Sequence, residues 1–275
     1  MPPNQPPVAP DLLDAAYVNQ VLSTAARTAF SVRIVAETGS TNDDLFAAAT
    51  LPPGSVLAAE RQTAGRGRRG RPWIAPPGTH LAFSLLWKFE RDLAGLSGLS
   101  LAVGVAVLRA ARVLGAAGIK LKWPNDLIAL LPTGWAKIGG ILIEARSGEA
   151  GSCHAVIGIG LNVSCSPAAD LIGQRAASLA DLGVPACRND VLAAVLEALL
   201  PALNQFQSQG FRSFARDWNV HHAFSGETVK LQSEGVPVLE GIARDVDDDG
   251  ALMIESESGM HHAVSGEVSL RAAAD

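Results

Sequence analysis

The stretch Gly-Arg-Gly-Arg-Arg-Gly-Arg-Pro-Trp, residues 65–73, lies between two segments with strand character, residues 55–61 and 79–89. The whole connection, residues 62–78, is rich in glycine, arginine and proline and has little apolar material for a core. Connections of this length inside a compact domain are usually functional or disordered. The stretch therefore predicts a functional loop between two strands of a sheet.

The arginine loop, residues 65–73, formally contains the pattern GxGxxG. A dinucleotide site needs a helix to open at the last glycine, and Arg71-Pro72-Trp73 blocks one. No GxxxxGK[ST] pattern occurs, which excludes a P-loop. Three interpretations stay open on the loop alone. The loop could close over a polyanion through bidentate guanidinium contacts, and it would then be mobile when no anion is bound. It could instead bind single-stranded nucleic acid, or it could be a solvated basic loop.

Composition limits the class of protein. The chain has 275 residues, of which 48% are hydrophobic, and this is enough apolar material for a sizeable core. Its net charge of −5 argues against a general nucleic-acid binder. The three cysteines form no CxxC pair, which favours a reducing compartment. The N-terminus has no signal-peptide pattern, and Arg109 and Arg112 interrupt the apolar residues 99–117. We expect a soluble cytoplasmic protein without a membrane span.

Outward from the loop, strands and helices mix as far as Asn219. Strands are expected at residues 30–36, 120–123, 126–131, 135–145 and 154–163. Helices are expected at residues 11–27, 97–115, 190–207 and 211–218, and one more after the capping residues Ser40–Asp43. Short strands at residues 229–231, 236–244, 251–255 and 261–264 then indicate a small β-barrel. The fold class is α+β with a β appendage.

Three further motifs carry residues with chemical potential. In Lys122–Asp126 (KWPND), Pro124 turns the chain and presents Asn125 and Asp126. Lys137 precedes Gly139-Gly140, and residues 158–162 contain two glycines and Asn162. Each motif taken alone has an ordinary structural explanation: an Asx turn, a solvent-facing lysine or a tight packing contact. No His or Cys spacing indicates a protein-bound metal.

Taken together and in order, these motifs closely resemble those of biotin–protein ligases, also called biotin–[acetyl-CoA-carboxylase] ligases. The resemblance covers residues 30–271, and the arginine loop paired with KWPND is its most specific part. It implies a mixed β-sheet catalytic domain with helices, of the class II aminoacyl-tRNA synthetase-like type, followed by a small SH3-like β-barrel. The expected divisions are an N-terminal tail and helix at 1–29, the catalytic domain at 30–220 and the barrel at 221–275.

The resemblance implies an enzyme that forms biotinyl-5′-adenylate from biotin and ATP with Mg²⁺, and then biotinylates a lysine of a biotin carboxyl carrier protein. The implied catalytic residues are Lys137, Arg68 and Asp126. The implied biotin-binding residues are Ser40, Thr41, Asn42, Gln62, Gly65, Arg66, Trp73, Lys137, Gly139 and Gly158. The implied ATP-binding residues are Arg66, Arg68, Arg71, Asn125, Asp126, Lys137, Asn162 and Arg271. Mg²⁺ would arrive with ATP rather than on protein side chains.

The residue types suit that chemistry. A carboxylate must attack a phosphate, so positive charge is needed where negative charge develops, and a ureido ring needs a few hydroxyl and amide partners in an apolar slot. About thirty residues before the core are too few for a helix-turn-helix domain, so we expect no DNA binding. A lipoate–protein ligase or octanoyltransferase of related fold and a nucleic-acid-binding module are the alternatives. Monomer and homodimer stay open.

Overall fold

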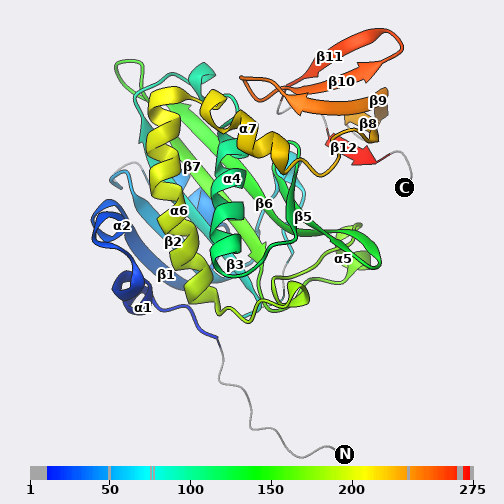
Figure 1. Cartoon of the computed structure of the whole chain (residues 1–275). Coiled ribbons are helices and arrows are strands. Elements are labelled where there is room, and N and C mark those ends of the chain that lie inside the picture. Colours follow the sequence, from blue (N-terminus) through cyan, green and yellow to red (C-terminus); the bar gives the residue numbers. More distant parts are fainter. Residues whose placement is uncertain are drawn as a thin grey trace, which may run out of the picture.

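The computed structural model describes residues 11–48, 51–74, 76, 78–233, 236–264 and 269–272. Its largest element is a seven-stranded mixed sheet in the order β1-β2-β3-β7-β6-β5-β4 (Figure 1). The strands are β1 (Ser31–Thr38), β2 (Ser55–Gln62), β3 (His80–Phe89), β4 (Ile119–Lys122), β5 (Asp126–Leu131), β6 (Gly134–Ser147) and β7 (Cys153–Asn162). β1 and β2 pair in parallel, and the other neighbours pair antiparallel.

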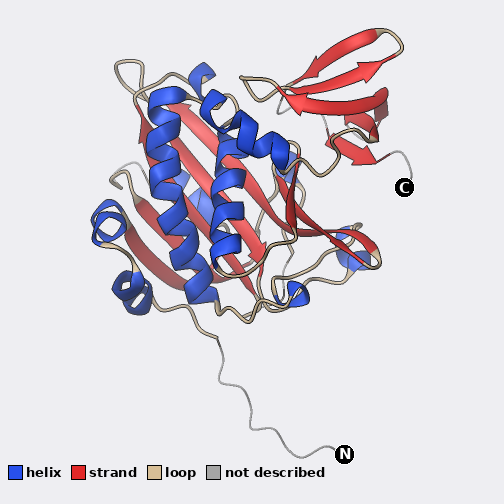
Figure 2. Cartoon of the chain, in the orientation of Figure 1, coloured by secondary structure: helices blue, strands red, loops and turns tan. Residues whose placement is uncertain are grey.

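Two long helices, α4 and α6, lie side by side over one face of this sheet (Figure 2). The helices are α1 (Ala15–Val21), α2 (Thr24–Ala29), α3 (Thr41–Ala47), α4 (Leu99–Val113), α5 (Ala169–Ile172), α6 (Arg188–Gln209) and α7 (Arg212–Val220), with short 3₁₀ turns at Arg68–Gly70, Ala94–Leu96 and Ala180–Leu182. The face of α4 and α6 and the facing strands contribute to one continuous hydrophobic core. The predicted α+β class is confirmed.

The apolar helix α4 is a core element. By length and composition alone, the segment Ala94–Val113 could cross a membrane, contrary to the expectation that its arginines would exclude this. In the structure 67% of that segment's apolar window is buried inside the protein. Most side chains of α4 are buried against the sheet, α6 and α7, which explains why its sequence is largely apolar, while Arg109, Arg112 and Val113 are exposed.

The N-terminal helix predicted at residues 11–27 was wrong in its bounds. Asp14, rather than Asp11, caps α1 by accepting hydrogen bonds from the backbone N–H groups of Ala16 and Tyr17. Ser23 then caps a separate α2. A second capping residue inside the segment allows the chain to end one helix and start another.

The C-terminal region is a five-stranded antiparallel sheet. Its strands are β8 (Thr228–Ser233), β9 (Val236–Val246), β10 (Leu252–Ser256), β11 (Gly259–Ala263) and β12 (Ser269–Ala272), in the order β11-β10-β9-β8-β12. The sheet confirms the β-rich appendage, and its closure into a barrel stays a prediction. A hydrogen bond connects the C-terminal sheet to the region of the large sheet: the Nε1–H of Trp123, in the turn between β4 and β5, donates to the carbonyl of Gly250, between β9 and β10, at 3.1 Å.

The large sheet divides at the end that carries the arginine loop. The ladder between β2 and β3 ends at the pair Ala59–Ala82. Beyond it β2 stays paired with β1 as far as Gln62, and β3 stays paired with β7 down to His80. We call this divergence of β2 from β3 the fork. The arginine loop leaves one arm of the fork and returns to the other.

Candidate functional site

The N-terminus of α3 supplies a buried set of polar side chains. Ser40 is the N-cap, and its hydroxyl accepts from the Asp43 backbone N–H at 3.4 Å. The next two residues, Thr41 and Asn42, are 3% and 4% exposed and face the sheet. The Thr41 backbone N–H donates to Gln62 Oε1 on β2 at 2.8 Å. The predicted biotin-binding residues Ser40, Thr41, Asn42 and Gln62 therefore lie together.

A hydrogen-bonded chain runs through this set and fixes its polarity. Asn42 Nδ2 donates to Glu144 Oε2 at 2.8 Å, because an ionised carboxylate can only accept. Asn42 Oδ1 then accepts from Ser84 Oγ at 2.6 Å. Since Ser84 directs its one proton to Asn42, it accepts from the Thr41 hydroxyl, 2.7 Å away. The same hydroxyl also donates toward Gln62 Oε1 at 3.1 Å, so the single Thr41 proton is shared between Ser84 and Gln62.

Two glycines make room for these side chains. A Cβ added at Gly158 on β7 would lie 2.2 Å from Asn42 Oδ1. A Cβ added at Gly65 would lie 3.0 Å from Gln62 Nε2 and 3.1 Å from the Trp73 carbonyl. In this structure, Gly158 thus accommodates a polar side chain of the site. Gly139 instead packs against Leu161, whose Cδ2 would lie 2.5 Å from an added Cβ.

The arginine loop is folded back on itself. The Gly67 N–H donates to the Arg71 carbonyl at 2.7 Å, and the Trp73 N–H donates to the Gly65 carbonyl at 2.8 Å. Arg69 has φ +58° within the 3₁₀ turn at the tip. Two backbone hydrogen bonds therefore link the two sides of the loop, and its mobility without an anion stays a prediction.

Arg66 connects the loop to the polar set. Its guanidinium forms ion pairs with Asp43, in the first turn of α3, and with Glu144 Oε1 at 3.4 Å. The hydrogen bond to Asp43 and the charge of Glu144 raise the pKa of Arg66. Glu144 thus contacts both the loop and Asn42 of the buried set.

A second cluster contains the two cations proposed for catalysis. Lys137 Nζ lies 2.7 Å from Asp126 Oδ1, with both side chains less than one-fifth exposed. Arg68 Nη1 donates to Asn125 Oδ1 at 3.5 Å. Burial lowers the pKa of Arg68, and the charge of Arg69 lowers it further, while Asp126 raises it. The arginine loop and the KWPND turn therefore meet, through Arg68 and Asn125.

Trp73 lies between the two clusters. Lys137 Nζ is 5.6 Å from the centre of the indole, within the range of a cation–π contact. A Cβ added at Gly160 would lie 2.6 Å from Trp73 Cε2, so the bare backbone of β7 receives the ring. Within the described ranges, the buried Trp73 Nε1 and Asn162 Oδ1 have no hydrogen-bond partner. A buried polar atom of this kind marks a place where a ligand can supply the missing bond.

The remaining predicted site residues differ in their contacts. Asn162, at the end of β7, lies next to the lysine cluster, since its Nδ2 donates to the Ala177 carbonyl at 2.9 Å and to the Lys137 carbonyl at 3.4 Å. Arg71 contributes backbone contacts to the loop. Arg271 lies in β12 opposite Lys230, and its side chain is outside the described part of the chain.

Sequence reasoning missed Ser84 and Glu144, whereas Gly160 was part of the two-glycine motif of residues 158–162. Ser84 is fully buried in the middle of β3, and its hydroxyl is a signal only after Thr41 is placed opposite it. Glu144 ends the apolar run Ile141–Ile143, where an acidic residue on a strand is a signal that could have been read.

The mixed sheet thus carries the arginine loop, the buried hydroxyl–amide set and the Lys137–Asp126 pair. Residues 32–162 match the model of the Biotin/lipoate A/B protein ligase family, and residues 224–271 match the Biotin protein ligase C terminal domain.

Relatives and solved structures agree with these matches. The bifunctional ligase/repressor BirA of Salmonella typhimurium is 34% identical over 264 residues, covering 95% of this chain and 79% of the relative. The biotin--[acetyl-CoA-carboxylase] ligase of Mycobacterium tuberculosis is 37% identical over 230 residues, covering 81% and 82%. The structure of the Aquifex aeolicus biotin protein ligase in complex with biotin and ATP superposes with a TM-score of 0.76 at 31% identity, covering 88% and 99%. The chain belongs to the biotin protein ligase family.

Proposed function

We propose that this protein activates biotin with MgATP to biotinyl-5′-adenylate and transfers the biotinyl group to a lysine of a biotin carboxyl carrier protein. The observation that carries the proposal is that Arg68 and Lys137 both contact the KWPND turn, through Asn125 and Asp126, while the same loop contacts the buried hydroxyl–amide set through Arg66 and Glu144. Family membership and the ligand-bound Aquifex relative support it.

In the first step, a biotin carboxylate oxygen attacks the α-phosphorus of ATP. The bond from the α-phosphorus to the bridging oxygen breaks, and diphosphate leaves. Both reactants are anions, so fixed cations at the reacting centre lower the barrier most. Lys137 and Arg68 supply this charge, and Asp126 holds the Lys137 ammonium in place until the substrate anions replace its carboxylate.

The hydroxyl–amide set supplies hydrogen bonds to the ureido ring. The proton of the Thr41 hydroxyl is engaged by Ser84 and Gln62, so the lone pairs of Thr41 Oγ1 suit a ring N–H group. Gln62 turns its Oε1 to Thr41, so its Nε2 donors point away toward Gly65 and suit a carbonyl oxygen. Trp73 provides an apolar wall next to Lys137, where the chain between ring and carboxylate can pass.

Mg²⁺ belongs to the nucleotide in this proposal. In the part of the chain that the structure describes, no group of three or more His, Cys, Asp or Glu side chains could hold a metal ion. The ion would neutralise the triphosphate, while Asn125 and Asp126 are the nearest oxygen-bearing side chains to Arg68 and Lys137.

In the second step, the acceptor lysine attacks the acyl carbon of the mixed anhydride, and AMP leaves. The attacking amine must first lose a proton, since the reference pKa of lysine is about 10.4. The folded arginine loop keeps water from the anhydride between the two steps. We include a cytoplasmic location in this proposal. The three cysteines are free thiols, as expected in a reducing compartment.

Incubation of the purified chain with MgATP, biotin and a carrier-domain fragment, followed by intact mass analysis, tests the proposal. A mass increase of one biotinyl group on the carrier, with release of diphosphate, is expected. Lipoate in place of biotin distinguishes the alternative substrate, because the matching family model includes both activities. Modification by lipoate alone, or release of no diphosphate with either acid, would overturn the proposal.

A further inference from the structure

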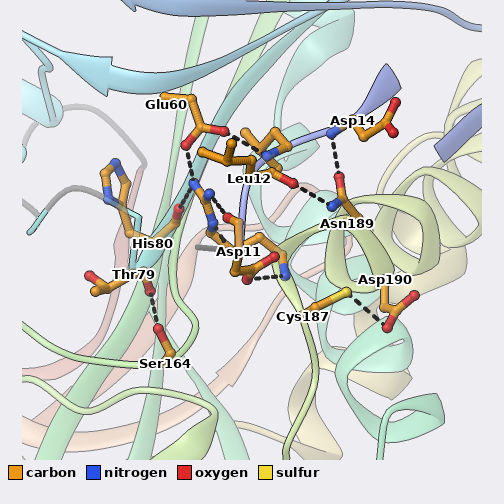
Figure 3. A network of polar contacts seen from close by, with 12 residues as sticks. Asp11, Leu12, Asp14, Glu60, Thr79, His80, Ser164, Cys187, Asn189 and Asp190 are labelled. Carbon is orange, nitrogen blue, oxygen red and sulfur yellow. Dashed lines mark hydrogen bonds and ion pairs between the residues drawn. The ribbon is translucent and has the colours of Figure 1, made fainter. Parts of the chain in front are cut away.

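The guanidinium of Arg188 is fully buried, although no step of the proposed reaction uses it. It lies at the first residue of α6, on the helix-covered side of the large sheet. Its Nη1 lies 2.8 Å from Glu60 Oε2 and donates to the His80 carbonyl at 3.4 Å. Its Nη2 donates to the Asp11 carbonyl, and its Nε lies 3.6 Å from Asp11 Oδ2. Figure 3 shows Asp11, Glu60 and His80 gathered around this centre.

Two of these partners are on opposite arms of the fork. Glu60 is on β2, one residue beyond the last β2–β3 ladder pair. His80 is the first residue of β3, on the other arm. Arg188 therefore contacts both strands where they no longer contact each other through a ladder. Residues 63–79 connect the two arms and contain the arginine loop.

Each arm also carries residues of the site. Gln62 lies two residues beyond Glu60, and its amide holds the Thr41 backbone. His80 pairs in register with Asn162 on β7, and its Nδ1 lies 2.9 Å from the Pro76 carbonyl at the end of the loop. The width of the fork therefore sets the separation of the hydroxyl–amide set from Asn162, and the separation of the two ends of the loop.

The N-terminal segment completes the arrangement. The Leu13 N–H donates to Glu60 Oε1 at 2.6 Å, and Asp11 Oδ2 accepts from the Arg188 backbone N–H at 2.8 Å. Asn189 holds the segment on α6 through Leu12 and Asp14 (Figure 3). Glu60 is thus fixed from two sides, by a cation and by the backbone of residue 13.

We propose that Arg188, with Glu60 and Asp11, is a positioning residue that holds the fork at a fixed width and so keeps the arginine loop closed. The inference rests on the proposed function for its consequence in catalysis. A planar guanidinium can bind two carboxylates and a carbonyl at once, whereas an ammonium cannot reproduce this geometry. Loss of the contacts should therefore loosen both ends of the loop without removing any group that touches substrate.

Two variants separate positioning from simple stability. Arg188→Lys keeps the charge and loses the planar geometry. The pair Arg188→Met with Glu60→Gln removes the buried guanidinium together with the charge of its partly exposed partner, keeps an acceptor for the Leu13 N–H, and leaves the Asp11 carboxylate in partial contact with solvent. Replacing an ion pair as a whole is often neutral for stability. Arg109→Met, which removes an exposed ion pair with Asp217, is the control for loss of an arginine elsewhere.

The first measurement is the rate of trypsin cleavage after Arg66, Arg68 and Arg69 in the full chain, together with the melting temperature; the Arg71–Pro72 bond is not a trypsin site. We expect at least tenfold faster cleavage in both Arg188 variants and no change in the control, with the melting temperature of the double variant close to that of the wild type. This readout does not depend on ligase activity, so it remains informative if the proposed function fails.

The second measurement is the half-life of enzyme-bound biotinyl-adenylate, which we expect to fall about tenfold in both variants while the Kd for biotin changes less than threefold. A folded double variant that resists trypsin and retains the adenylate like the wild type would overturn the inference. If the double variant does not fold, wild-type cleavage and retention in a folded Arg188→Lys protein would overturn it as well.

Discussion

The ammonium group of Lys137 lies 2.7 Å from the carboxylate of Asp126, although the two residues come from different strands, β6 and β5. Asp126 directly follows the tight turn between β4 and β5, whereas Lys137 lies within β6. They meet because β5 and β6 form a hairpin whose register brings Asp126 opposite Gly140, and an added Cβ at Gly140 would lie 3.2 Å from Lys137 Nζ. The Asp126 carboxylate on β5 thereby positions the Lys137 ammonium of β6.

Replacing Lys137 with alanine should slow adenylate formation by about 10²–10³-fold, the usual loss when one preorganised electrostatic donor is removed. Biotin-dependent exchange of diphosphate into ATP measures this step. Lys88→Ala, which removes a surface ion pair with Glu90, is the control and should exchange like the wild type. An unchanged rate in Lys137→Ala would contradict the role given to this ammonium.

Replacing Arg68 with alanine should make the adenylate leak from the enzyme. Its guanidinium is largely buried and reaches Asn125, so a charge-assisted contact of about 1.5–3 kcal/mol is lost, equivalent to about tenfold or more. The half-life of bound adenylate after a chase with unlabelled biotin measures the effect. Biotin affinity should change little; equal retention in the variant would show that Arg68 does not help close the site.

Gly158→Ala should weaken biotin binding at least tenfold. The new Cβ would lie 2.2 Å from Asn42 Oδ1, and relief of such overpacking costs about 1–3 kcal/mol. Gly118→Ala is the matched control, because an added Cβ there meets nothing within 4 Å. Titration calorimetry gives the Kd for biotin of both variants. Equal Kd values would show that Gly158 does not contribute to biotin binding.

Glu144→Gln should also weaken biotin binding by about tenfold. This effect does not require that Glu144 itself contacts the ureido ring of biotin. A neutral amide can donate, so the Asn42 side chain can turn over and reverse the donor order through Ser84 to Thr41. A hydrogen bond to a charged group contributes about 1.5–3 kcal/mol. The Kd measured beside a Glu149→Gln control checks this, and an unaltered value would mean that Glu144 does not fix the polarity.

Acid should destabilise the protein through His222. Burial lowers the pKa of this ring, which packs on Trp218, from 6.5 to about 4. The unfolded chain then binds more protons than the folded chain between these values, so the stabilisation is complete above pH 6.5 and falls as the pH drops toward 4. The loss approaches about 3 kcal/mol.

Urea unfolding of His222→Phe at several pH values tests this prediction. The variant should show a shallower loss of unfolding free energy below pH 6.5, with a remaining slope from His80, whose pKa burial also lowers. Identical slopes in the variant and the wild type would contradict the assignment to His222.

The sequence predicted the elements well wherever local signals and periodicity agree. Ser40 as a cap, the strands around the arginine loop and the hairpin after Pro132 all follow from residues close in the chain. The early helix was wrong because Ser23 offers a second start that hydrophobic periodicity does not register. Strand β12 was missed altogether.

The candidate site was predictable in its motifs but not in its internal partners. The pairing of Arg66 with Asp43 and Glu144, and of Arg188 with Glu60, joins residues separated by 23 to 128 positions. Such pairs depend on tertiary packing, since a single sequence gives no measure of which buried charges meet. The contact of the Trp73 indole with Gly160 could not be predicted either, because it depends on the path that the arginine loop takes over β7.

The hydrogen bond from Trp123 to Gly250 bears on how the chain can be divided. Trp123 is fully buried and directly precedes the turn that presents Asn125 and Asp126. A truncation at residue 221 would strand its indole N–H in an apolar setting and uncover the helix α4 beneath. The two lobes are therefore poor modules for separate expression, and a fusion partner is better attached at either terminus than inserted at their junction.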